Sequence, residues 1–331
     1  MSATIDDVAL KAGVSKATVS RVFNNSASVS SSTRTRVLAA MKKLDYTPNL
    51  HARKLAGGSG AIALVLQESV KEFFANPFWR DVVDGFVSTA AQQQHHPVLL
   101  FHSQNEGHLE LINTLTLGNF DEVAIFGWHQ DIALLERNIP MGIRVVFGGR
   151  QGDSHRFTYV GANNRLGAHL ATAHLIERGC SRIATITGDL SIESGRERLA
   201  GYKTALEEAN LPYTEKLVVR GDYTENSVRQ SLQIFLENEI PFDGIFAAND
   251  IMAIEAIKLL YNFSIRVPED VRVVGFDDIP QAALCSPPLS TIQQPSYELG
   301  QRVAEQLLCR NSEELSNIEL PLSLKIRASS R

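Results

Sequence analysis

The chain has 331 residues, more than the roughly 250 to 300 that a single hydrophobic core usually serves, and this length predicts two or three domains. Its hydrophobic fraction of 44% and charged fraction of 21% are typical of a globular protein, and no apolar run approaches the ~18 residues that span a membrane. The first twenty residues do not form a secretory signal, and the three cysteines have no C-x-x-C spacing. We therefore expect a cytoplasmic protein without a membrane partner, a disulfide framework or a metal site.

The charge is distributed unevenly along the chain. Residues 1–60 contain nine Lys and Arg against three Asp, a net charge of +6, whereas the remaining chain has 23 basic and 34 acidic residues, a net charge of −11. A basic head on an acidic body is the pattern of a module that binds a polyanion, attached to a part that does not. The alternative is an accidental excess of charge on a small solvated domain.

Three short helices are predicted in the basic head. Thr4 and Asp7 resemble a capping box for a helix over residues 5–12, and Gly13 supplies the positive φ that ends it. Ser15 caps a second helix over residues 16–24. A third helix follows the serines at 30–32, with its apolar residues at helical spacing at Val37, Leu38, Met41 and Leu44. Two helices joined by a tight glycine turn, with a third beside them, predict a helix-turn-helix unit.

The outward face of the second helix carries groups that suit nucleic acid. Hydroxyls at Ser15, Thr18 and Ser20 are suited to phosphates, and the planar guanidinium of Arg21 is suited to the edge of guanine. Lys16 and Ala17 lie in the first turn, where such a helix reaches base edges. The alternative is a capped surface helix of a small bundle.

These residues form the motif T-I-D-D-V-A-x-x-A-G-V-S-x-x-T-V-S-R-V-x-N, followed by V-S-x-x-T-R-x-x-V and Y-x-P-N-x-x-A-R-x-L. The motif resembles the head of the lactose-repressor and galactose-repressor (LacI/GalR) family of bacterial transcription regulators. The resemblance implies that Lys16, Ala17 and Arg21 read bases in the major groove. It also implies a set of residues that hold phosphates, namely Ser15, Thr18, Ser20, Asn24, Ser30, Thr33 and Asn49.

Residues 49–60 begin with a short helical pattern and end in a glycine-rich tether. A helix of this length is marginal alone in water. The resemblance implies a hinge helix that orders on the operator and inserts Leu55 into the minor groove, where an apolar wedge kinks the duplex. A plain linker is the alternative, and it leaves Leu55 unexplained.

From residue 61 onward, short β-branched runs alternate with helical stretches, which predicts an α/β body with parallel, doubly wound sheets and helices on both faces. The number of units favours two sheets in two lobes, as in periplasmic binding proteins. We expect a head at 1–48, a hinge at 49–60 and a body at 61–331. The first lobe is expected to contain about 61–160 plus 291–320, and the second about 161–290 plus the C-terminal strand. The strands are predicted at 62–66, 98–101, 122–126, 144–147, 182–187, 216–219, 244–247 and 272–275.

Polar side chains follow several of these strands, at the edge where open α/β sheets bind ligands. Asn249, Asp277 and Gln294 offer amides and a carboxylate, Arg198 begins a helix, and Tyr223 offers an aromatic face. This set suits the hydroxyls and the apolar face of a sugar. The alternative is that some of these residues are helix caps or structural pairs; we predict that Asp250 and Ser194 act partly as caps.

The resemblance extends through the body, in F-A-A-N-D-x-M-A, V-P-E-D-V-R-V-V-G-F-D-D and P-P-L-S-T-I-x-Q. It implies that Arg198, Tyr223, Asn249, Asp277 and Gln294 bind an effector, and that Phe78 closes the cleft from the first lobe. Two departures stand out. Asn163-Asn164 replaces the family's Asp-Asn, and residues 67–75 are about five residues longer than the common pattern.

The chain lacks the sequence signatures of phosphate loops, metalloproteases and nucleophile elbows, so we expect neither an enzyme nor a cofactor. The predicted function is a dimeric repressor that binds a pseudo-palindromic operator and responds to a small effector, favoured to be a sugar. One alternative is a solute-binding receptor without a DNA function. Another is a sugar-modifying enzyme with a DNA-binding head.

Overall fold

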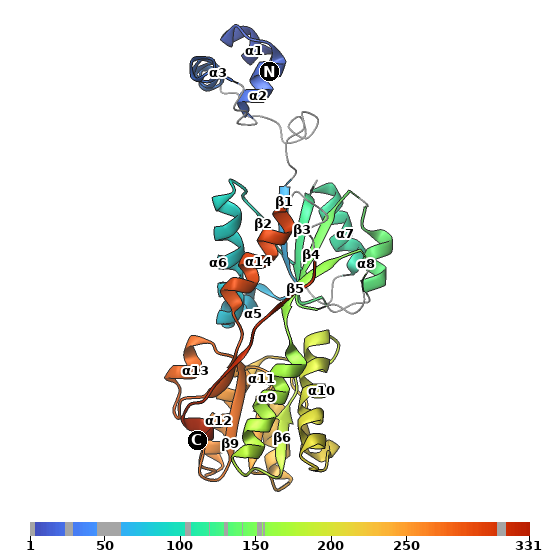
Figure 1. Cartoon of the computed structure of the whole chain (residues 1–331), viewed down its shortest axis with the longest axis vertical. Coiled ribbons are helices and arrows are strands. Elements are labelled where there is room, and N and C mark those ends of the chain that lie inside the picture. The colour runs from blue at the N-terminus through green and yellow to red at the C-terminus, as the bar shows by residue number, and fades with distance from the viewer. Residues whose placement is uncertain are drawn as a thin grey trace. The chain divides into compact units, whose positions relative to one another are not determined.

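The computed structural model describes residues 4–23, 29–44, 61–102, 107–118, 120–128, 132–140, 142–150, 154, 156–309 and 316–331. The chain forms two compact units, a head (Met1–Ala61) and a body (Ile62–Arg331) (Figure 1). None of the helices in the described part of the chain combines the length and the apolarity required to cross a membrane.

The head contains the three predicted helices, α1 (Ile5–Ala12), α2 (Lys16–Phe23) and α3 (Ser31–Lys43). The capping box is confirmed, because Thr4 Oγ1 accepts from the Asp7 N–H at 3.3 Å and the Asp7 carboxylate accepts from the Thr4 N–H at 2.8 Å. Gly13 ends α1 at φ 64°, as predicted. Ser15 caps α2 by accepting from the Thr18 N–H at 3.1 Å.

The core of the head is a small apolar cluster between the three helices. Val8, Val19 and Val37 are completely buried and come from one helix each. Leu38, one of the apolar residues at helical spacing, lies outside this core, since it is 52% exposed. Ala40 is buried in the core instead, because the face of α3 that meets α1 and α2 passes through positions 37, 40, 41 and 44.

The first lobe of the body is built on a six-stranded sheet with strand order β11-β5-β4-β3-β1-β2, and the ladders of β1 with β2, β3 with β4, β4 with β5, and β5 with β11 are parallel. The strands are β1 (Ala61–Leu66), β2 (Val98–Phe101), β3 (Phe120–Phe126), β4 (Arg144–Gly148), β5 (Thr158–Ala162) and β11 (Ile318–Leu320). The helices of this lobe are α5 (Val70–Ala75), α6 (Pro77–Gln92), α7 (His108–Leu117), α8 (Ile132–Asn138) and α14 (Ser296–Leu308). Figure 1 shows α6 and α14 side by side, and they pack together extensively.

The second lobe is built on a sheet with strand order β12-β10-β9-β8-β6-β7, in which β12 is antiparallel to β10. The strands are β6 (Ile183–Ile186), β7 (Val218–Val219), β8 (Gly244–Ala247), β9 (Arg272–Asp277), β10 (Ser290–Gln293) and β12 (Ser323–Lys325). The helices are α9 (Asn164–Glu177), α10 (Glu193–Glu208), α11 (Glu225–Glu237), α12 (Asp250–Asn262) and α13 (Pro280–Leu284), with short 3-10 turns at Glu215–Leu217 and Ala328–Ser330. The predicted strand at 216–219 is thus half a 3-10 turn.

The chain passes between the lobes three times, after β5, after β10 and between β11 and β12 (Figure 1). The predicted return at residue 291 is too early, because β10 pairs with β9 from Ser290 to Gln293 and so belongs to the second lobe. Strand β12 is the predicted C-terminal strand of the second lobe, whereas β5, β10 and β11 are short or of mixed polarity and were not among the predicted strands.

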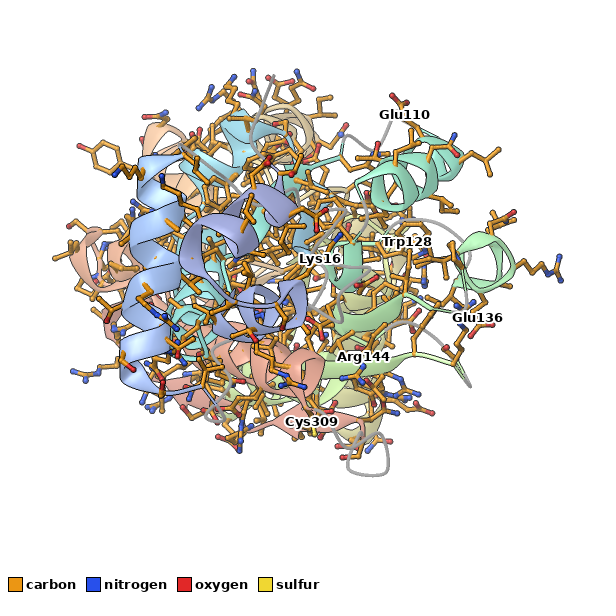
Figure 2. The ribbon with its side chains drawn as sticks, turned by 90° about the horizontal axis from the view of Figure 1, so that it is seen from above. Lys16, Glu110, Trp128, Glu136, Arg144 and Cys309 are labelled. Carbon is orange, nitrogen blue, oxygen red and sulfur yellow. The ribbon has the colours of Figure 1, made fainter. Side chains whose placement is uncertain are left out.

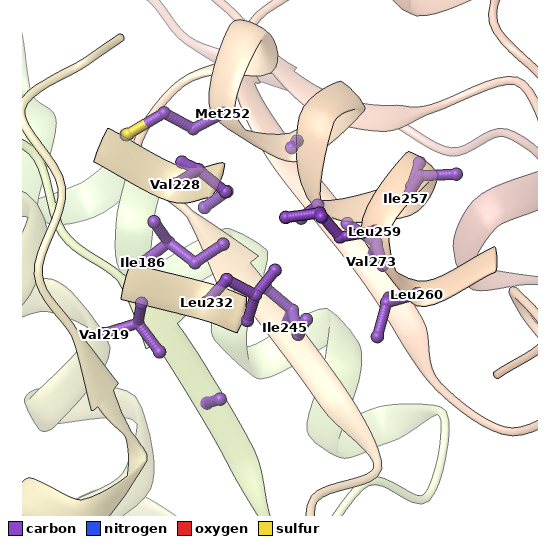
Figure 3. Packing of buried hydrophobic residues seen from close by; sticks show 14 of the residues in the cluster. Ile186, Val219, Val228, Leu232, Ile245, Met252, Ile257, Leu259, Leu260 and Val273 are labelled. Carbon is purple, nitrogen blue, oxygen red and sulfur yellow. The ribbon is translucent and has the colours of Figure 1, made fainter. Parts of the chain in front are cut away.

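An extensive apolar core lies in the second lobe, between its sheet and helices α11 and α12. Leu232, Ile245, Leu260 and Val273 are completely buried there (Figure 3). Removing a buried leucine side chain from such a core costs about 2–5 kcal/mol. This packing makes the second lobe a rigid support for the side chains at the ends of its strands.

Candidate functional site

The exposed face of α2 is the first candidate site. Lys16, Ala17 and Arg21 are all exposed, so their side chains are accessible in the head itself. Lys16, labelled in Figure 2, forms an ion pair of 3.1 Å with Asp6, and both side chains are more than half exposed. An exposed ion pair of this kind contributes only about 0–1 kcal/mol, so Lys16 can leave Asp6 for a phosphate or a base at little cost.

The hydroxyls predicted to hold phosphates lie at the starts of α2 and α3. Ser15 and Thr18 share a hydrogen bond of 2.9 Å, and Ser30 Oγ donates to Thr33 Oγ1 at 2.9 Å while it caps α3. The backbone of Ser20 lies within α2. Asn24, Asn49 and Leu55 lie outside the described residues. The hydroxyls that are described therefore lie beside helix N-termini, where the backbone dipoles also favour an anion.

The second candidate site is a cavity of ≈ 750 Å³ in the body, lined by residues of both lobes. All of the predicted effector residues line it, namely Phe78, Arg198, Tyr223, Asn249, Asp277 and Gln294. Asn249 and Gln294 follow β8 and β10, and Asp277 ends β9, because parallel strands present their carboxyl ends at one edge of a sheet. Arg198 does not begin a helix as predicted, since α10 begins at Glu193.

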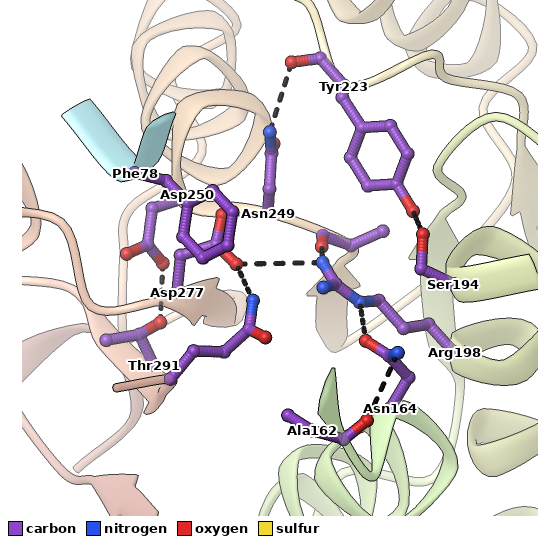
Figure 4. Close-up of polar contacts among 12 residues, drawn as sticks. Phe78, Ala162, Asn164, Ser194, Arg198, Tyr223, Asn249, Asp250, Asp277 and Thr291 are labelled. Atoms are coloured by element: carbon purple, nitrogen blue, oxygen red, sulfur yellow. Dashed lines mark hydrogen bonds and ion pairs between the residues drawn. The ribbon is translucent and has the colours of Figure 1, made fainter. Parts of the chain in front are cut away.

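Arg198 is the centre of the polar network (Figure 4). It is 6% exposed and lies over the ring of Phe276, with the guanidinium carbon 3.8 Å from the ring centroid. Its Nε donates to Asn164 Oδ1 at 2.9 Å, and Nη1 donates to the Ala248 carbonyl and lies 3.7 Å from Asp277 Oδ1. A buried arginine held by so many partners is fixed in orientation before any ligand arrives.

Asp277 lies at the end of β9 with an unusual backbone. Its φ is 114°, in the region that non-glycine residues avoid, and such strain is concentrated at functional sites. Gln294 Nε2 donates to Asp277 Oδ1 at 2.6 Å. Burial raises the pKa of Asp277 to about 6, while Arg198 and Gln294 oppose that rise. The carboxylate therefore keeps its charge at neutral pH through these two neighbours.

Tyr223 supplies an aromatic wall, also with positive φ, at 73°. Its ring lies over Gly188, where an added Cβ would approach the ring to 2.1 Å. Its hydroxyl shares a hydrogen bond of 3.1 Å with Ser194. The prediction that Ser194 caps a helix is wrong, because the N-cap position of α10 is Ile192 and Ser194 is its second residue.

Asn249, rather than Asp250, caps the helix that follows β8. Asn249 is the N-cap of α12, accepting from the Met252 N–H at 2.9 Å, and its Nδ2 donates to the Tyr223 carbonyl at 3.1 Å. Asp250 is not the cap; its carboxylate accepts from the Ile279 N–H and from Thr291. Burial raises the pKa of Asp250 well above its ordinary value, with the charge of Asp277 as the second cause. Asn249 thus shapes the cavity wall by holding the backbone that presents Tyr223.

The first lobe contributes Phe78 and its surroundings. Asn76 caps α6 by accepting from the Phe78 N–H at 3.1 Å, and Pro77 occupies the first turn. Phe78 packs against the buried cores of both lobes and meets Trp79 edge-on, with ring centroids 5.1 Å apart. It is therefore placed where a relative motion of the lobes changes its contacts.

Several cavity residues were not predicted as contacts. Asn164 Nδ2 donates to Glu197 at 3.2 Å while its oxygen receives Arg198, and Arg150 of the first lobe lies 3.8 Å from Glu197. Trp128 and Glu68 also line the cavity. The unusual Asn163-Asn164 pair was the one sequence signal for Asn164, but its partners Glu197 and Arg198 are more than thirty residues away. Nothing in the local pattern around Trp128 or Arg150 distinguishes them from ordinary loop residues.

The arrangement suits recognition of a polar, ring-shaped ligand. It offers fixed donors and acceptors at Arg198, Asp277 and Gln294, beside the aromatic face of Tyr223. Such groups hydrogen-bond hydroxyls and pack on the apolar face of a sugar. Within the described residues, no three His, Cys, Asp or Glu side chains are grouped to hold a metal ion.

Comparison with known proteins is consistent along the whole chain. Residues 4–49 match the family "Bacterial regulatory proteins, lacI family", and residues 172–330 match "Periplasmic binding protein-like domain". The HTH-type transcriptional regulator CelR of Thermobifida fusca is 37% identical over 310 residues, covering 93% of this chain and 91% of that one.

Solved structures agree with these matches. A complex of the transcriptional regulator CelR with cellobiose has a TM-score of 0.76 at 35% identity and covers 99% of both chains. A lac repressor dimer bound to operator and the anti-inducer ONPF has a TM-score of 0.84 at 29% identity, covering 100% of this chain and 99% of that one.

Proposed function

Because the chain belongs to the LacI family of bacterial regulatory proteins, we propose that it is a transcriptional repressor that binds operator DNA as a dimer and is controlled by a small effector. The effector binds in the cavity between the lobes, and a sugar is the class that its lining favours. The protein works in the cytoplasm, where chromosomal DNA is accessible. It is a regulator rather than an enzyme, as its relatives are.

The observation that carries this proposal is the combination, in one chain, of an exposed basic helix face and a prebuilt polar cavity. The face consists of Lys16, Ala17 and Arg21 on α2, which is the recognition helix of the proposed interface. Arg21 pairs with a guanine edge, and Lys16 leaves its weak ion pair with Asp6 on binding. Ser15, Thr18, Ser30 and Thr33 hold the phosphates, and we extend the proposal to Ser20, Asn24 and Asn49 in that role and to Leu55 as the minor-groove wedge.

The identity of the effector follows from the same cavity and from the relatives. Arg198, Asp277 and Gln294 hydrogen-bond sugar hydroxyls, and Tyr223 stacks on the ring. Since a similar CelR structure contains cellobiose, β-linked glucosides are the first sugars to test.

The mechanism requires the effector to distinguish two arrangements of the lobes. A ligand shifts such an equilibrium only by its difference in affinity for the two states. Arg198 and Asp277 belong to the second lobe and Phe78 to the first, so a ligand that contacts all three binds more tightly when the lobes are close. Closure then changes the surfaces of the first lobe that meet the partner subunit, and with them the spacing of the two heads on the operator.

The test is a selection of bound DNA from a random pool by the purified full-length protein, with and without candidate sugars. The proposal predicts a pseudo-palindromic site whose recovery depends on the sugar. A solute receptor with an incidental basic head would bind sugar but enrich no symmetric site, and that outcome would reject the proposal.

Variants of α2 separate base reading from phosphate contact. Arg21→Ala should relax the sequence preference, whereas Thr18→Ala should weaken binding evenly across sequences. Equal effects of the two variants on specificity would show that the face has been divided incorrectly.

A further inference from the structure

The first-lobe wall of the cavity is built by a segment that follows β1. Ser69 caps α5 through a reciprocal capping box, in which the Glu72 N–H donates to Ser69 Oγ at 3.1 Å and the Ser69 N–H donates to Glu72 at 3.0 Å. Phe73 anchors the helix in the first-lobe core. Glu68, Lys71 and Glu72 consequently line the cavity.

Glu68 is a carboxyl group of this wall with side-chain hydrogen bonds to two residues, Trp79 and Glu72. The Trp79 indole N–H donates to it, and Glu72 and Asp222 are the negative charges nearest to it, Asp222 belonging to the second lobe. The Glu72 carboxylate accepts from the Ser69 N–H, and the Asp222 carboxylate accepts from the Thr224 backbone and hydroxyl. An ionised carboxyl group accepts about four hydrogen bonds, so Glu68 retains capacity for donors of a ligand.

Burial, reinforced by Glu72, raises the pKa of Glu68 to about 7. A neutral hydrogen-bond donor that enters the cavity beside Glu68 therefore stabilises the charge of its carboxylate. Sugar hydroxyls are such donors, and they bring no charge that Asp222 or Glu72 would repel.

The charge balance of the cavity selects against anions. Among the described residues that line it, seven are Asp or Glu and three are Lys or Arg. Two of those three cations are already paired, Arg198 with Asp277 and Arg150 with Glu197. The third, Lys71, is exposed, so a phosphorylated or carboxylated effector would meet one solvated cation against the excess of carboxylates.

The size and the aromatic groups of the cavity indicate a ligand longer than one ring. Its volume of ≈ 750 Å³ lies in the upper part of the roughly 300–1,000 Å³ range of pockets for drug-sized ligands. Tyr223 is the aromatic wall of the second lobe, while Trp79 and Trp128 line the cavity from the first. Trp128 is 1% exposed, and none of the described residues accepts a hydrogen bond from its indole N–H.

We propose, on the basis of the proposed function, that Glu68 is the specificity-determining residue of the first lobe and selects an uncharged effector of at least two sugar rings. One ring occupies the second-lobe network of Arg198, Asp277 and Gln294. The hydroxyls of the other ring donate to the Glu68 carboxylate, between α5 and the segment 222–226 that faces it.

The experiment measures the affinity of the full-length protein at pH 8 for glucose, galactose, cellobiose, maltose, lactose and glucose 6-phosphate, by calorimetry. At least one disaccharide should bind tenfold or more tightly than either monosaccharide, and glucose 6-phosphate should not bind. Glu68→Gln should lower the affinity for that disaccharide about tenfold and the affinity for the monosaccharides less than twofold. Glu110→Gln is the matched control, because Glu110 is exposed on α7 of the same lobe and outside the cavity, and it should change nothing (Figure 2).

The inference is overturned if a monosaccharide binds as tightly as every disaccharide, if glucose 6-phosphate binds most tightly, or if Glu68→Gln leaves disaccharide affinity unchanged. It also fails if no sugar binds at all. Operator selection in the same preparation then shows whether the proposed repressor function fails with it. If Glu68→Gln does not fold, Glu68→Asp is the second variant, because it keeps the charge on a shorter side chain. It must lower the affinity for the disaccharide more than the affinity for the monosaccharides.

Discussion

The two walls of the cavity are built in different ways. The second-lobe wall is a closed network, in which Arg198, Asp277, Gln294 and Asn164 are buried and hold one another. The first-lobe wall is a capped helix of six residues with a partly buried carboxyl group, Glu68, in front of it. A wall whose polar groups already hydrogen-bond to one another fixes the position of a ligand. A wall with unused hydrogen-bond acceptors decides which ligand is accepted. The following variants test that difference.

The largest effect is expected for Arg198→Met. This variant leaves Asp277 buried without its cation, which costs about 3 kcal/mol of unfolding free energy and removes effector binding. Denaturant unfolding of the full chain measures the loss. Arg196→Met on the same helix is the control, because Arg196 is half exposed and pairs with Glu193 at the surface, so it should cost less than about 1 kcal/mol. Similar losses in both variants would contradict a closed network.

Gly188→Ala should displace Tyr223. The new methyl group meets the tyrosine ring at 2.1 Å, and overpacking of this kind costs about 2 kcal/mol. Thermal unfolding and sugar affinity should both fall, because the aromatic wall moves. Gly142→Ala has open space around its Cβ and should alter neither quantity. A sugar affinity that survives Gly188→Ala would mean that Tyr223 does not contact the effector.

Glu68→Gln should stabilise the protein in a pH-dependent manner. The pKa of Glu68 is raised from 4.5 to about 7 by burial and by Glu72, so the folded state holds this proton more tightly than the unfolded state. The stabilisation of the folded state by the protonated Glu68 carboxyl group is complete below pH 4.5 and is lost as the pH rises through 7. The variant should therefore match the native protein at pH 4.5 and exceed it by about 3 kcal/mol at pH 8. Glu110→Gln should show no such trend, and a constant difference across this range would refute the assignment.

Ser69→Ala should have the smallest effect. It removes the N-cap of α5 and costs about 1 kcal/mol or less, most of it local to this helix. Hydrogen exchange of the α5 amides should accelerate while the global unfolding midpoint moves little. Ser88→Ala, within α6 of the same lobe, is the control and should leave α5 unaffected. If the α5 amides exchange at the native rate in Ser69→Ala, the helix does not depend on its cap.

The same contrast explains what the sequence predicted and what it did not. The helices of the head, the alternating α/β body and the residues at the strand ends were all predictable, because caps, periodicity and parallel topology are local or regular. The partners of those residues were not. Asn249 and Asp250 are adjacent, yet which one caps α12 depends on Thr291, Ile279 and Tyr223, which are distant in the sequence.

The first-lobe wall was the harder part to predict. The segment 67–75 was recognised as unusually long. Its capping box and the contact of Glu68 with Trp79 depend on the path that the chain takes from β1 to α6. Trp128 follows β3 without any pattern that marks it. Sequence periodicity predicts which face of an element is buried, and it carries no information on which buried polar groups meet across two lobes.

The three passages between the lobes have a consequence for how the chain folds. Helix α14 and strand β11 complete the first lobe, and strand β12 completes the second, so each lobe needs residues beyond Gln293. Pairing of strands that are far apart in the sequence is slow, because the chain loses conformational entropy before the stabilising contacts form. The described core of the head joins residues no further apart than Ile5 and Leu44, so the head should fold early, during synthesis, whereas both lobes require the same final forty residues or so. The chain should thus acquire its DNA-reading helices well before it acquires the sensor that governs them.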